Sequence, residues 1–455
     1  MSEEKKDSNV DKIQDLLKLL ALNNGDVQKL NSQQRKAFEE YKFWRTQQVV
    51  SFDEKFDKEG VIDDTKTPAD IPDKPLPLID GFTWCNINPD DPNELDDLFV
   101  LLNENYVEDK HSVFRFNYKE AFLNWALKAP GWKIEWNVGV RVQSTGKLVA
   151  FISAIPLTLR IRDNAIPSVE VNFLCIHKQL RSKRLAPLMI MEIQRRVNRY
   201  DIWQALYTAG VVLPSPISTC RYTHRALNWT KLYETGFTDL PGDRTAPQMV
   251  AECAIPKVTK MQGLRPMKKE DVPEAFALLS KYQERFDLAH LFDEEEFKHW
   301  FLGSQDDNKV IFSYVVEQPD GKITDFFSFY SLPFSILGNA KHDQVEIAYL
   351  YYYATDADFE YNDRFSKEAT EVSKQRLTEL VGDALILAKN MGMDVFNALT
   401  SQENTLFLEN LKFGLGDGLL NFYTLNYKAF PITGGLKPDN TIDAEKRSNV
   451  GVVML

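Results

Sequence analysis

The chain has 455 residues and a formal net charge of −12 at pH 7, with 44% hydrophobic and 26% charged residues. These values are ordinary for a globular protein and leave room for two or three domains or one large one. The negative balance argues against general nucleic-acid binding, which needs a basic face, and is compatible with binding basic peptides.

Four cysteines, Cys85, Cys175, Cys220 and Cys253, lie far apart and include no C-x-x-C pair. This spacing favours buried thiols in a reducing compartment over a disulfide framework or a zinc site. The sequence shows no N-terminal apolar run typical of a signal peptide and no apolar segment of about 18 residues. We therefore expect a cytosolic protein with no membrane span and no bound metal.

The first part of the chain predicts a polar arm, a linker, a helix and two strands. Residues 1–35 are polar and charged, which indicates a mobile arm, and the proline-rich residues 51–80 indicate an extended linker. A helix is expected over 91–106, where Pro92 suits the first turn and apolar residues recur on one face. The β-branched runs 136–142 and 148–155 predict strands.

Residues 169–199 combine a buried strand, a basic loop and a helix start. Four cations follow the strand Val169–Ile176 within seven residues: Lys178, Arg181, Lys183 and Arg184. Pro187 suits the first turn of a helix over 187–199. The unpaired N–H groups and the dipole of a helix start favour an anion, so the loop predicts a phosphate site. On spacing alone, a solvated basic turn is an equally good interpretation.

The remainder predicts one more strand, an irregular stretch and then a second set of elements. Residues 203–213 read as a strand and 214–245 as irregular. Ser366 is expected to cap a long helix that ends at Gly392. The other expected elements are helices near 270–286 and 293–303, strands over 310–318, 323–329, 347–355, 395–399 and 419–427, and a short helix over 406–411. This order repeats that of the first half, although the loop at 363–367 lacks the cluster of four cations.

The segment V-N-F-L-C-I-H-K-Q-L-R-S-K-R, residues 171–184, resembles the first signature of the myristoyl-CoA:protein N-myristoyltransferase family, also called glycylpeptide N-tetradecanoyltransferases. Residues 412–418, K-F-G-L-G-D-G, resemble the second signature, with leucine at 415 where the family often has proline. The resemblance runs from Lys42 to Leu455 and is closest to the fungal members.

The resemblance implies an α+β protein with a duplicated GNAT-like acyltransferase fold, a mixed central sheet flanked by helices, and halves related by a pseudo-two-fold axis. Residues 36–220 would bind acyl-CoA. Residues 221–455 would bind the peptide and carry the C-terminal carboxylate. The mobile arm, 1–35, is a segment that the family often links to ribosome association.

The implied reaction moves the myristoyl group from myristoyl-CoA to the N-terminal glycine amine of proteins, without a prosthetic group. Peptide substrates often carry Ser or Thr at position 5 and basic residues beyond it. Aromatic faces and the carboxylate of Asp417 suit such a peptide. We expect a monomer that binds no nucleic acid.

Three sets of site residues follow from the resemblance. The catalytic set is Asn172, Phe173, Leu174, Thr208 and Leu455. The acyl-CoA set is Tyr41, Lys42, Phe43, Trp44, Val171, Cys175, Ile176, Arg181, Ser182, Lys183, Arg184, Leu185 and Ala186. The peptide set is Tyr106, Phe114, Phe116, Tyr118, His224, Tyr349, Asp417 and Gly418.

In the implied mechanism, backbone N–H groups of Phe173 and Leu174 form the oxyanion hole, which requires a β-bulge there. Asn172 and Thr208 hold the glycine amine. The Leu455 carboxylate acts as base, because an apolar terminus is a poor solvated tail and would insert, where desolvation raises a carboxylate pKa. Cys175 could suggest a thioester relay, but a buried strand cysteine is the favoured interpretation.

His177 and His224 could suggest a base, but a structural or positional role is favoured for both. Three alternatives stay open on the sequence alone: transfer of another acyl chain or to another amine, an acyl-CoA carrier that does not use the terminal carboxylate, and a peptide-binding adaptor. The aromatic residues 114–118 also fit a half-buried strand or loop as well as a ligand floor.

Overall fold

The computed structural model of the chain describes residues 42–455 apart from 52–53, 107–112, 182 and 304–308. The predicted arm, Tyr41 and Ser182 therefore lie outside the described residues, and their predicted roles stay predictions. Within the described residues, no helix has both the length and the apolarity needed to cross a bilayer.

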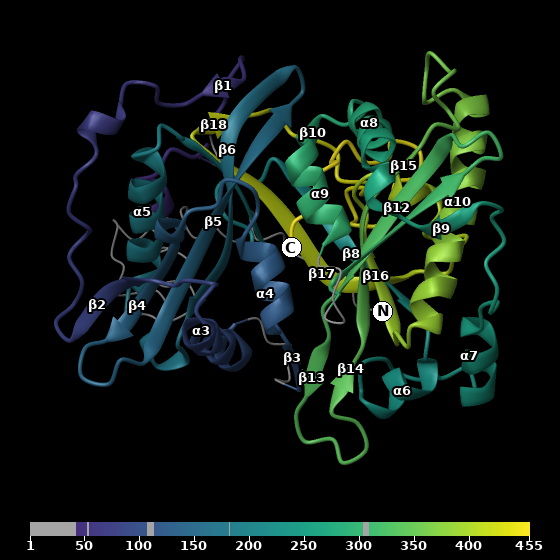
Figure 1. Cartoon of the computed structure of the whole chain (residues 1–455), viewed down its shortest axis with the longest axis horizontal. Coiled ribbons are helices and arrows are strands. Elements are labelled where there is room, and N and C mark those ends of the chain that lie inside the picture. Colours follow the sequence, from purple (N-terminus) through teal and green to yellow (C-terminus); the bar gives the residue numbers. More distant parts are fainter. Residues whose placement is uncertain (1–41, 52–53, 107–112, 182, 304–308) are drawn as a thin grey trace, which may run out of the picture.

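A mixed 13-stranded sheet extends through both halves of the molecule (Figure 1). Its order is β2-β4-β5-β6-β7-β17-β8-β16-β15-β12-β11-β9, and β10 pairs with β5. The first-half strands are β2 Phe82–Asn86, β4 Asn137–Val142, β5 Leu148–Ile161, β6 Asn164–Ile176, β7 Gln204–Ala209 and β8 Ser218–Ala226. The others are β9 Leu264–Pro266, β10 Leu288–His290, β11 Ile311–Glu317, β12 Ile323–Ser331, β15 Ile347–Thr355, β16 Val395–Leu399 and β17 Gly414–Leu425.

Two small sheets lie beside the main one. β1 Gly60–Val61 pairs with β18 Tyr427–Lys428, which ties the linker region to the end of the chain. β3 Phe114–Phe116 pairs with β13 Phe334–Ile336, and β13 pairs with β14 Gln344–Val345.

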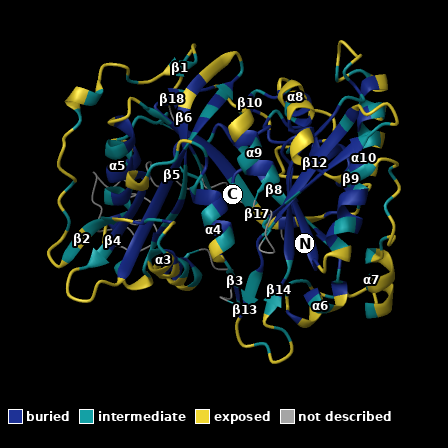
Figure 2. Cartoon of the chain, in the orientation of Figure 1, coloured by how far each residue is buried: buried dark blue, intermediate teal, exposed yellow. Residues whose placement is uncertain are grey.

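Helices cover both faces of the main sheet, whose strands are largely buried (Figure 2). They are α3 Pro92–Asn105, α4 Glu120–Leu127, α5 Leu185–Asn198, α6 Trp229–Glu234, α7 Ala246–Cys253, α8 Val272–Gln283, α9 Glu294–Leu302 and α10 Lys367–Asn390. Because side chains alternate along a strand, Ile152 of β5 packs with the α5 cluster. Its neighbour Phe151 packs with the cluster of α3 and α4.

The two halves repeat one strand and helix order, which confirms the predicted duplication. In the first half β4, β5 and β6 are antiparallel, α5 follows β6, and β7 returns parallel to β6. In the second half β11, β12 and β15 are antiparallel, α10 follows β15, and β16 returns parallel to β15.

The halves also exchange their next strands. β8 follows β7 in the chain but pairs with β16, and β17 follows β16 but pairs with β7. β8 and β17 pair with each other and join the halves. The predicted boundary between residues 220 and 221 lies within β8, and the domain limits stay a proposal.

Several predicted elements are confirmed, and two are wrong. Ser366 caps α10 by accepting a hydrogen bond from Ala369 N, and Gly392 follows the helix with φ 89°. The irregular stretch predicted over 214–245 is wrong, because it contains β8 and α6. The helix predicted over 406–411 is also wrong: a 3-10 turn, Asn404–Leu406, ends where it was expected to begin.

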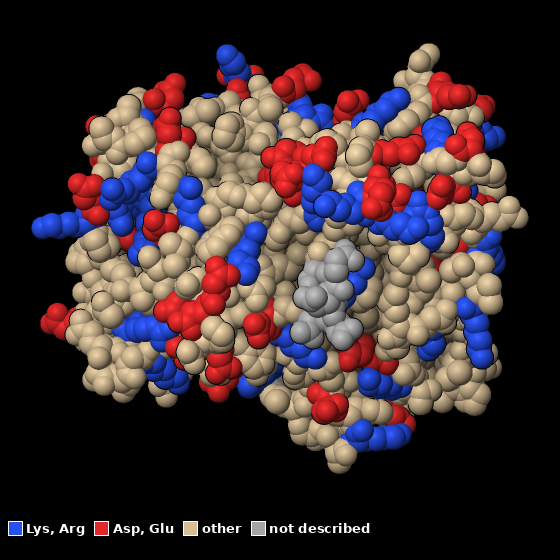
Figure 3. All heavy atoms as spheres, in the orientation of Figure 1, with Lys and Arg blue, Asp and Glu red and all other residues tan. Residues whose placement is uncertain are grey.

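Acidic and basic side chains are interspersed over the face shown in Figure 3. Such a mixed surface differs from the continuous basic face that a nucleic-acid-binding protein presents. Over the whole chain, acidic residues exceed basic ones, which gives the net charge of −12.

Candidate active site

The site begins where β6 and β7 separate. The two strands pair over three residue pairs, from Ser168↔Gln204 to Glu170↔Leu206. β6 then continues beside β5 as far as Ile176, while β7 pairs with β17 on its other side. The gap between the diverging strands opens into a large cavity.

A β-bulge lies at the head of this gap, as predicted. Phe151 and Ser153 of β5 pair with Cys175 and Asn172 of β6, so the one residue between them on β5 faces two on β6, Phe173 and Leu174. Phe173 has φ 56°, in the left-handed region that bulky residues rarely adopt. A bulge leaves a backbone group outside the ladder, and both bulged residues, Phe173 and Leu174, line the cavity.

Tyr106 contacts the bulge. Its ring lies 6.1 Å from the Phe173 ring, centroid to centroid. Burial raises the pKa of Tyr106, and a hydrogen bond between its hydroxyl and the Phe173 backbone acts in the opposite direction. The backbone of Phe173 at the bulge is therefore hydrogen-bonded by the hydroxyl of a neighbouring side chain.

The cavity has a volume of about 1400 Å³, above the roughly 300–1,000 Å³ of a single small-ligand pocket. One part, between β6, α5 and β7, is mainly apolar; its lining includes Ile152, Val171, Leu174, Ile190, Ile193 and Val197. The other part is aromatic and polar; its lining includes Tyr106, Phe114, Phe116, Tyr118, Tyr222, His224, Tyr349, Asp417 and Gly418. Two different ligands can thus lie in one connected space.

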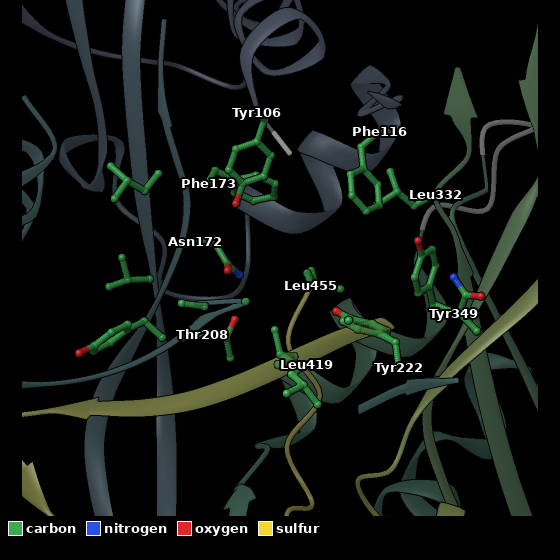
Figure 4. Close-up of a pocket in the computed structure, with 18 of the residues that line it drawn as sticks. Tyr106, Phe116, Asn172, Phe173, Thr208, Tyr222, Leu332, Tyr349, Leu419 and Leu455 are labelled. Carbon is green, nitrogen blue, oxygen red and sulfur yellow. The ribbon is translucent and has the colours of Figure 1, made fainter. Parts of the chain in front are cut away.

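Asn172, Thr208 and Leu455 gather where the two parts meet (Figure 4). Asn172 donates from Nδ2 to Glu170 Oε1 at 2.5 Å. The Leu455 backbone also hydrogen-bonds Glu170. Glu170 therefore links the end of the chain to the strand of the first signature.

Glu170 is a site residue that the sequence prediction missed. It is 6% exposed, and burial raises its pKa to about 7, against the hydrogen bonds from Asn172 and Leu455. A signal was present, because Glu170 is a carboxylate within an otherwise apolar strand, two residues before Asn172. A perturbed carboxylate in a cavity is a functional-site feature.

The apolar C-terminus is inserted, as predicted. Val450, Val452, Val453 and Met454 are buried, and Leu455 lines the cavity. Val453 N donates to Tyr352 Oη at 2.9 Å. The last residue of the chain therefore lies at the cavity, beside Asn172 and Thr208.

The basic loop leads into α5 as expected. The backbone N–H of Lys178 donates to Asn105 Oδ1 at 3.0 Å, and Arg181 donates to Asn105 O, so the loop is fixed to the end of α3. Arg184, at the N-cap, has φ 60°. Since this cap is a cation rather than a Ser, Thr, Asp or Asn acceptor, the first N–H groups of α5 suit an external anion.

The rest of the predicted acyl-CoA set lies on the segment that begins the described chain, at the end of β6 and in the first turn of α5. Trp44 is buried, lines the cavity and stacks on Tyr207 at 5.5 Å, and Phe43 packs edge-on against Trp44. Lys42 is exposed, and Lys183, like Arg181 and Arg184, is exposed in the loop. Leu185 and Ala186 occupy the first turn of α5, and Ile176 ends β6.

Cys175 has a structural environment. Its side chain is buried against α3, where the thiol donates to Leu101 O at 3.8 Å. Burial raises its pKa to about 12, so the reactive thiolate is disfavoured at neutral pH. A thioester relay gains no support from this geometry.

The second signature forms an irregular start of β17. Leu415 pairs with Thr223 and Leu419 with Arg221, so Gly416–Gly418 bulge opposite β8. A Cβ on Gly416 would lie 2.4 Å from His224 Nε2, which explains the need for glycine. His224 also bonds Asn397 at 2.7 Å; burial lowers its pKa, and nearby Asp417 acts against this.

Other cavity residues also escaped prediction. Tyr222 lies on β8, which was expected to be irregular. The remaining missed residues include Tyr207, Phe237, Tyr330, Phe334, Asn397 and Leu419. They lack any local motif.

The duplicated sheet carries a cavity that joins an apolar region to an aromatic, polar region, as an acyltransferase that moves an apolar acyl chain to a polar acceptor requires. The family model described as myristoyl-CoA:protein N-myristoyltransferase, N-terminal domain, matches residues 61–220. The corresponding C-terminal domain matches residues 234–453.

Curated relatives agree over the whole chain. Glycylpeptide N-tetradecanoyltransferase of Saccharomyces cerevisiae is 63% identical, with 100% of each chain covered, and that of Candida albicans is 53% identical over 97% of this chain and 96% of its own length. A crystal structure of the Saccharomyces cerevisiae N-myristoyltransferase with bound myristoyl-CoA matches with a TM-score of 0.91 and 62% identity, covering 98% of this chain and 100% of that one. The chain therefore belongs to the myristoyl-CoA:protein N-myristoyltransferase family, whose members transfer myristate from myristoyl-CoA to N-terminal glycine.

Proposed function

We propose that this chain transfers the acyl group in one direct step, with the backbone of Phe173 and Leu174 as oxyanion hole and the Leu455 carboxylate as base. The observation that carries the proposal is the position of Leu455, which lines the cavity together with Asn172 and the bulge. The apolar and the aromatic parts of the cavity meet at this point.

In this mechanism myristoyl-CoA lies with its chain in the apolar part and its thioester at the bulge. The Leu455 carboxylate takes a proton from the glycine ammonium, which Asn172 and Thr208 hold. The free amine attacks the thioester carbon, and the carbonyl oxygen becomes negative beside the bulge N–H groups. The amide C–N bond forms and the C–S bond breaks; the second proton of the amine passes to the departing sulfur, so CoA leaves as the thiol.

The basic loop accounts for recognition of the CoA phosphates. Arg181, Lys183 and Arg184 surround the start of α5, where free N–H groups and the helix dipole favour anions. The corresponding start of α10 is capped by Ser366. This difference supports acyl-CoA binding in the first half, with Lys42, Phe43 and Trp44 covering the ligand.

The aromatic part of the cavity suits the peptide. Tyr106, Phe114, Phe116, Tyr118 and Tyr349 line it as apolar walls. The polar side chain of His224 suits a Ser or Thr at position 5, and Asp417 with Gly418 at the rim suits basic residues beyond it.

We further propose that the enzyme acts in the cytosol as a monomer. All four cysteines are free, as expected for a reducing compartment. The proposed ribosome association would involve the arm, residues 1–35.

The test compares the full chain with a chain lacking Met454 and Leu455, using myristoyl-CoA and a short Gly-initiated peptide. We expect rapid transfer by the full chain. The truncated chain should lose at least about a hundredfold in single-turnover rate while it binds acyl-CoA with unchanged affinity. Equal rates would retain the activity and exclude the carboxylate mechanism, whereas tight binding without transfer by the full chain would favour a carrier.

A further inference from the structure

The second half contains a counterpart of the acyl-CoA gap. β15 and β16 pair over three residue pairs, from Ile347↔Val395 to Tyr349↔Asn397, and then separate, as β6 and β7 do after three pairs. In the first half this separation opens the cavity. In the second half the chain itself occupies the space beyond the last pair.

Residues 402–404 lie along β15 in that space. Gln402 donates from Nε2 to Tyr351 O at 2.8 Å. Glu403 N donates to Tyr353 Oη at 3.0 Å, and that hydroxyl donates to Asn404 Oδ1 at 2.8 Å. This segment thus pairs with the Tyr351 carbonyl and the Tyr353 hydroxyl of the diverging strand.

The C-terminal segment runs beside it. Gln402 N donates to Val450 O at 2.7 Å, and Val450 forms a parallel bridge with Leu288. Val453 N then donates to Tyr352 Oη at 2.9 Å on β15. Residues 447–455, hereafter the C-terminal segment, thus pass through the second half before Leu455 enters the cavity.

A buried ion cluster holds the start of this segment. Glu403 is 0% and Arg447 is 1% exposed. Arg447 donates from Nη1 to Glu403 Oε2 at 2.9 Å and from Nη2 to Arg364 O at 3.0 Å. Arg364 bonds the other Glu403 oxygen and donates to Asn449 Oδ1 at 2.6 Å.

The cluster also joins the segment to α10, because Arg447 hydrogen-bonds Thr370 in the first turn of that helix. Burying charged groups is costly, and a buried pair often stabilises a protein no more than apolar side chains of equal volume would. Its geometry is nevertheless specific, since both guanidinium groups must meet one carboxylate. A cluster of this kind therefore fixes position more than it adds stability.

We propose that Arg447, Glu403 and Arg364 are positioning residues for the terminal carboxylate. The C-terminal segment occupies the gap of the second half, and this ion cluster fixes the position of the segment so that Leu455 reaches the acyl-transfer centre. The inference rests on the proposed role of Leu455 as base. It adds that the pseudo-equivalent of the acyl-CoA gap serves to place that base.

The principal variant is Arg447→Met. It keeps the side-chain volume, and Glu403 retains Arg364 as partner, so no buried charge loses its last counterion. Because a displacement of about 1 Å can cost about a hundredfold in rate, we expect the single-turnover transfer rate to fall tenfold to a hundredfold. The Kd for myristoyl-CoA should stay within twofold, since the acyl site lies in the other half.

The pH profile distinguishes positioning from general loosening. With its base displaced, Arg447→Met should show a transfer rate that keeps rising with pH, as a base from solvent takes over. Arg447→Lys, which keeps the charge but reaches fewer partners, should recover part of the rate and the normal profile. If Arg447→Met does not fold, Arg447→Lys tests the proposal by the same measurements.

Arg285→Lys is the matched control. Arg285 forms a bidentate pair with Asp358 near α10, with side chains that are 10% and 1% exposed, and its hydrogen bonds go to Asp358 and Tyr282 rather than to the C-terminal segment. It should leave the transfer rate unchanged. A wild-type rate in Arg447→Met and Arg447→Lys, or an equal loss in Arg285→Lys, would overturn the inference.

The chain lacking Met454 and Leu455, measured in parallel, separates the two proposals. Full transfer by that chain rejects the carboxylate mechanism and with it the positioning role. Impaired transfer by that chain together with unimpaired Arg447 variants rejects the positioning role alone. Impairment of both, with acyl-CoA affinity retained, supports the inference.

Discussion

Replacing Glu170 with glutamine should make the protein more stable at pH 8 and leave it unchanged near pH 4.5. Burial raises the pKa of Glu170 to about 7, from an ordinary value of 4.5. Between these two pH values the unfolded chain has lost the proton that the folded chain still holds, so the free energy of unfolding falls as the pH rises. Above pH 7 the full free-energy cost of ionising the buried Glu170 is present.

The size of the effect follows from the two pKa values. Each pKa unit corresponds to about 1.36 kcal/mol, so the ionised Glu170 costs the fold about 3 kcal/mol at pH 8. Glutamine carries no charge to desolvate and can still accept one of the two hydrogen bonds. For a chain of 455 residues, with an unfolding entropy of about 2 cal/mol/K per residue, this amounts to about 3 °C in Tm.

The assay is thermal unfolding of wild type and Glu170→Gln at pH 8 and pH 5. Glu192→Gln is the control, because Glu192 is equally buried but its pKa is lowered: burial acts to raise it, and hydrogen bonds from Arg195 and Arg196 outweigh burial. The ionised Glu192 stabilises the fold above pH 4.5, so Glu192→Gln should lower Tm by a similar amount at pH 5 and at pH 8. A gain for Glu170→Gln that is equal at pH 5 and pH 8, or absent at pH 8, would refute the linkage.

Two further substitutions test the binding regions separately. Changing Lys183 and Arg184 together to alanine should weaken myristoyl-CoA binding about thirtyfold, or about 2 kcal/mol, through lost charge-assisted phosphate contacts; equilibrium binding should show no change in peptide affinity, and unchanged CoA affinity would contradict the loop assignment. Gly416→Ala places a methyl 2.4 Å from His224 Nε2 and 2.9 Å from Tyr222 O. Peptide binding should therefore weaken by about 1–3 kcal/mol, which is measured as a rise in the peptide KM. Steady-state kinetics check this, and a peptide KM equal to that of the wild type would count against a peptide site beside His224.

The strand, basic loop and helix around residues 169–199 could be predicted because local signals agree there. The β-branched run predicted the strand Val169–Ile176, and β6 ends at Ile176. Pro187 predicted a helix over 187–199, and the structure has α5 from Leu185 to Asn198. The bulge at Phe173 followed from the resemblance together with the requirement that an oxyanion hole leave the sheet ladder. In the same way Ser366 and Gly392 marked the ends of α10.

β8 could not be predicted, because its polar residues are satisfied only by distant partners. Thr223 is 0% exposed and donates to Ala398 O at 2.8 Å, and His224 bonds Asn397. Both partners lie on β16, some 170 positions further along the chain. The local propensities of Pro, Thr and Arg predict an irregular segment, whereas the structure places the strand near the middle of the main sheet.

Glu170 was missed for a related reason. Its carboxylate interacts with Leu455, at the other end of the chain, and no spacing rule connects the two. The wrong helix over 406–411 has a similar origin, since the segment before it is fixed on β15, where Gln402 donates to Tyr351 O and Asn404 accepts from Tyr353 Oη. In each case tertiary contacts, which the local pattern does not contain, decide the structure.

The exchange of β8 and β17 explains why one chain carries both halves of the site. β17 pairs with β7 beside Thr208, and β8 supplies Tyr222 and His224 to the peptide region while it pairs with β16. Neither half can therefore complete its own sheet. The C-terminal segment also joins the two halves, because it crosses the second half and ends at Glu170 of the first. A base delivered in this way reaches the acyl-transfer centre only when both halves are folded and joined, so the same contacts that unite the sheet also assemble the proposed catalytic groups.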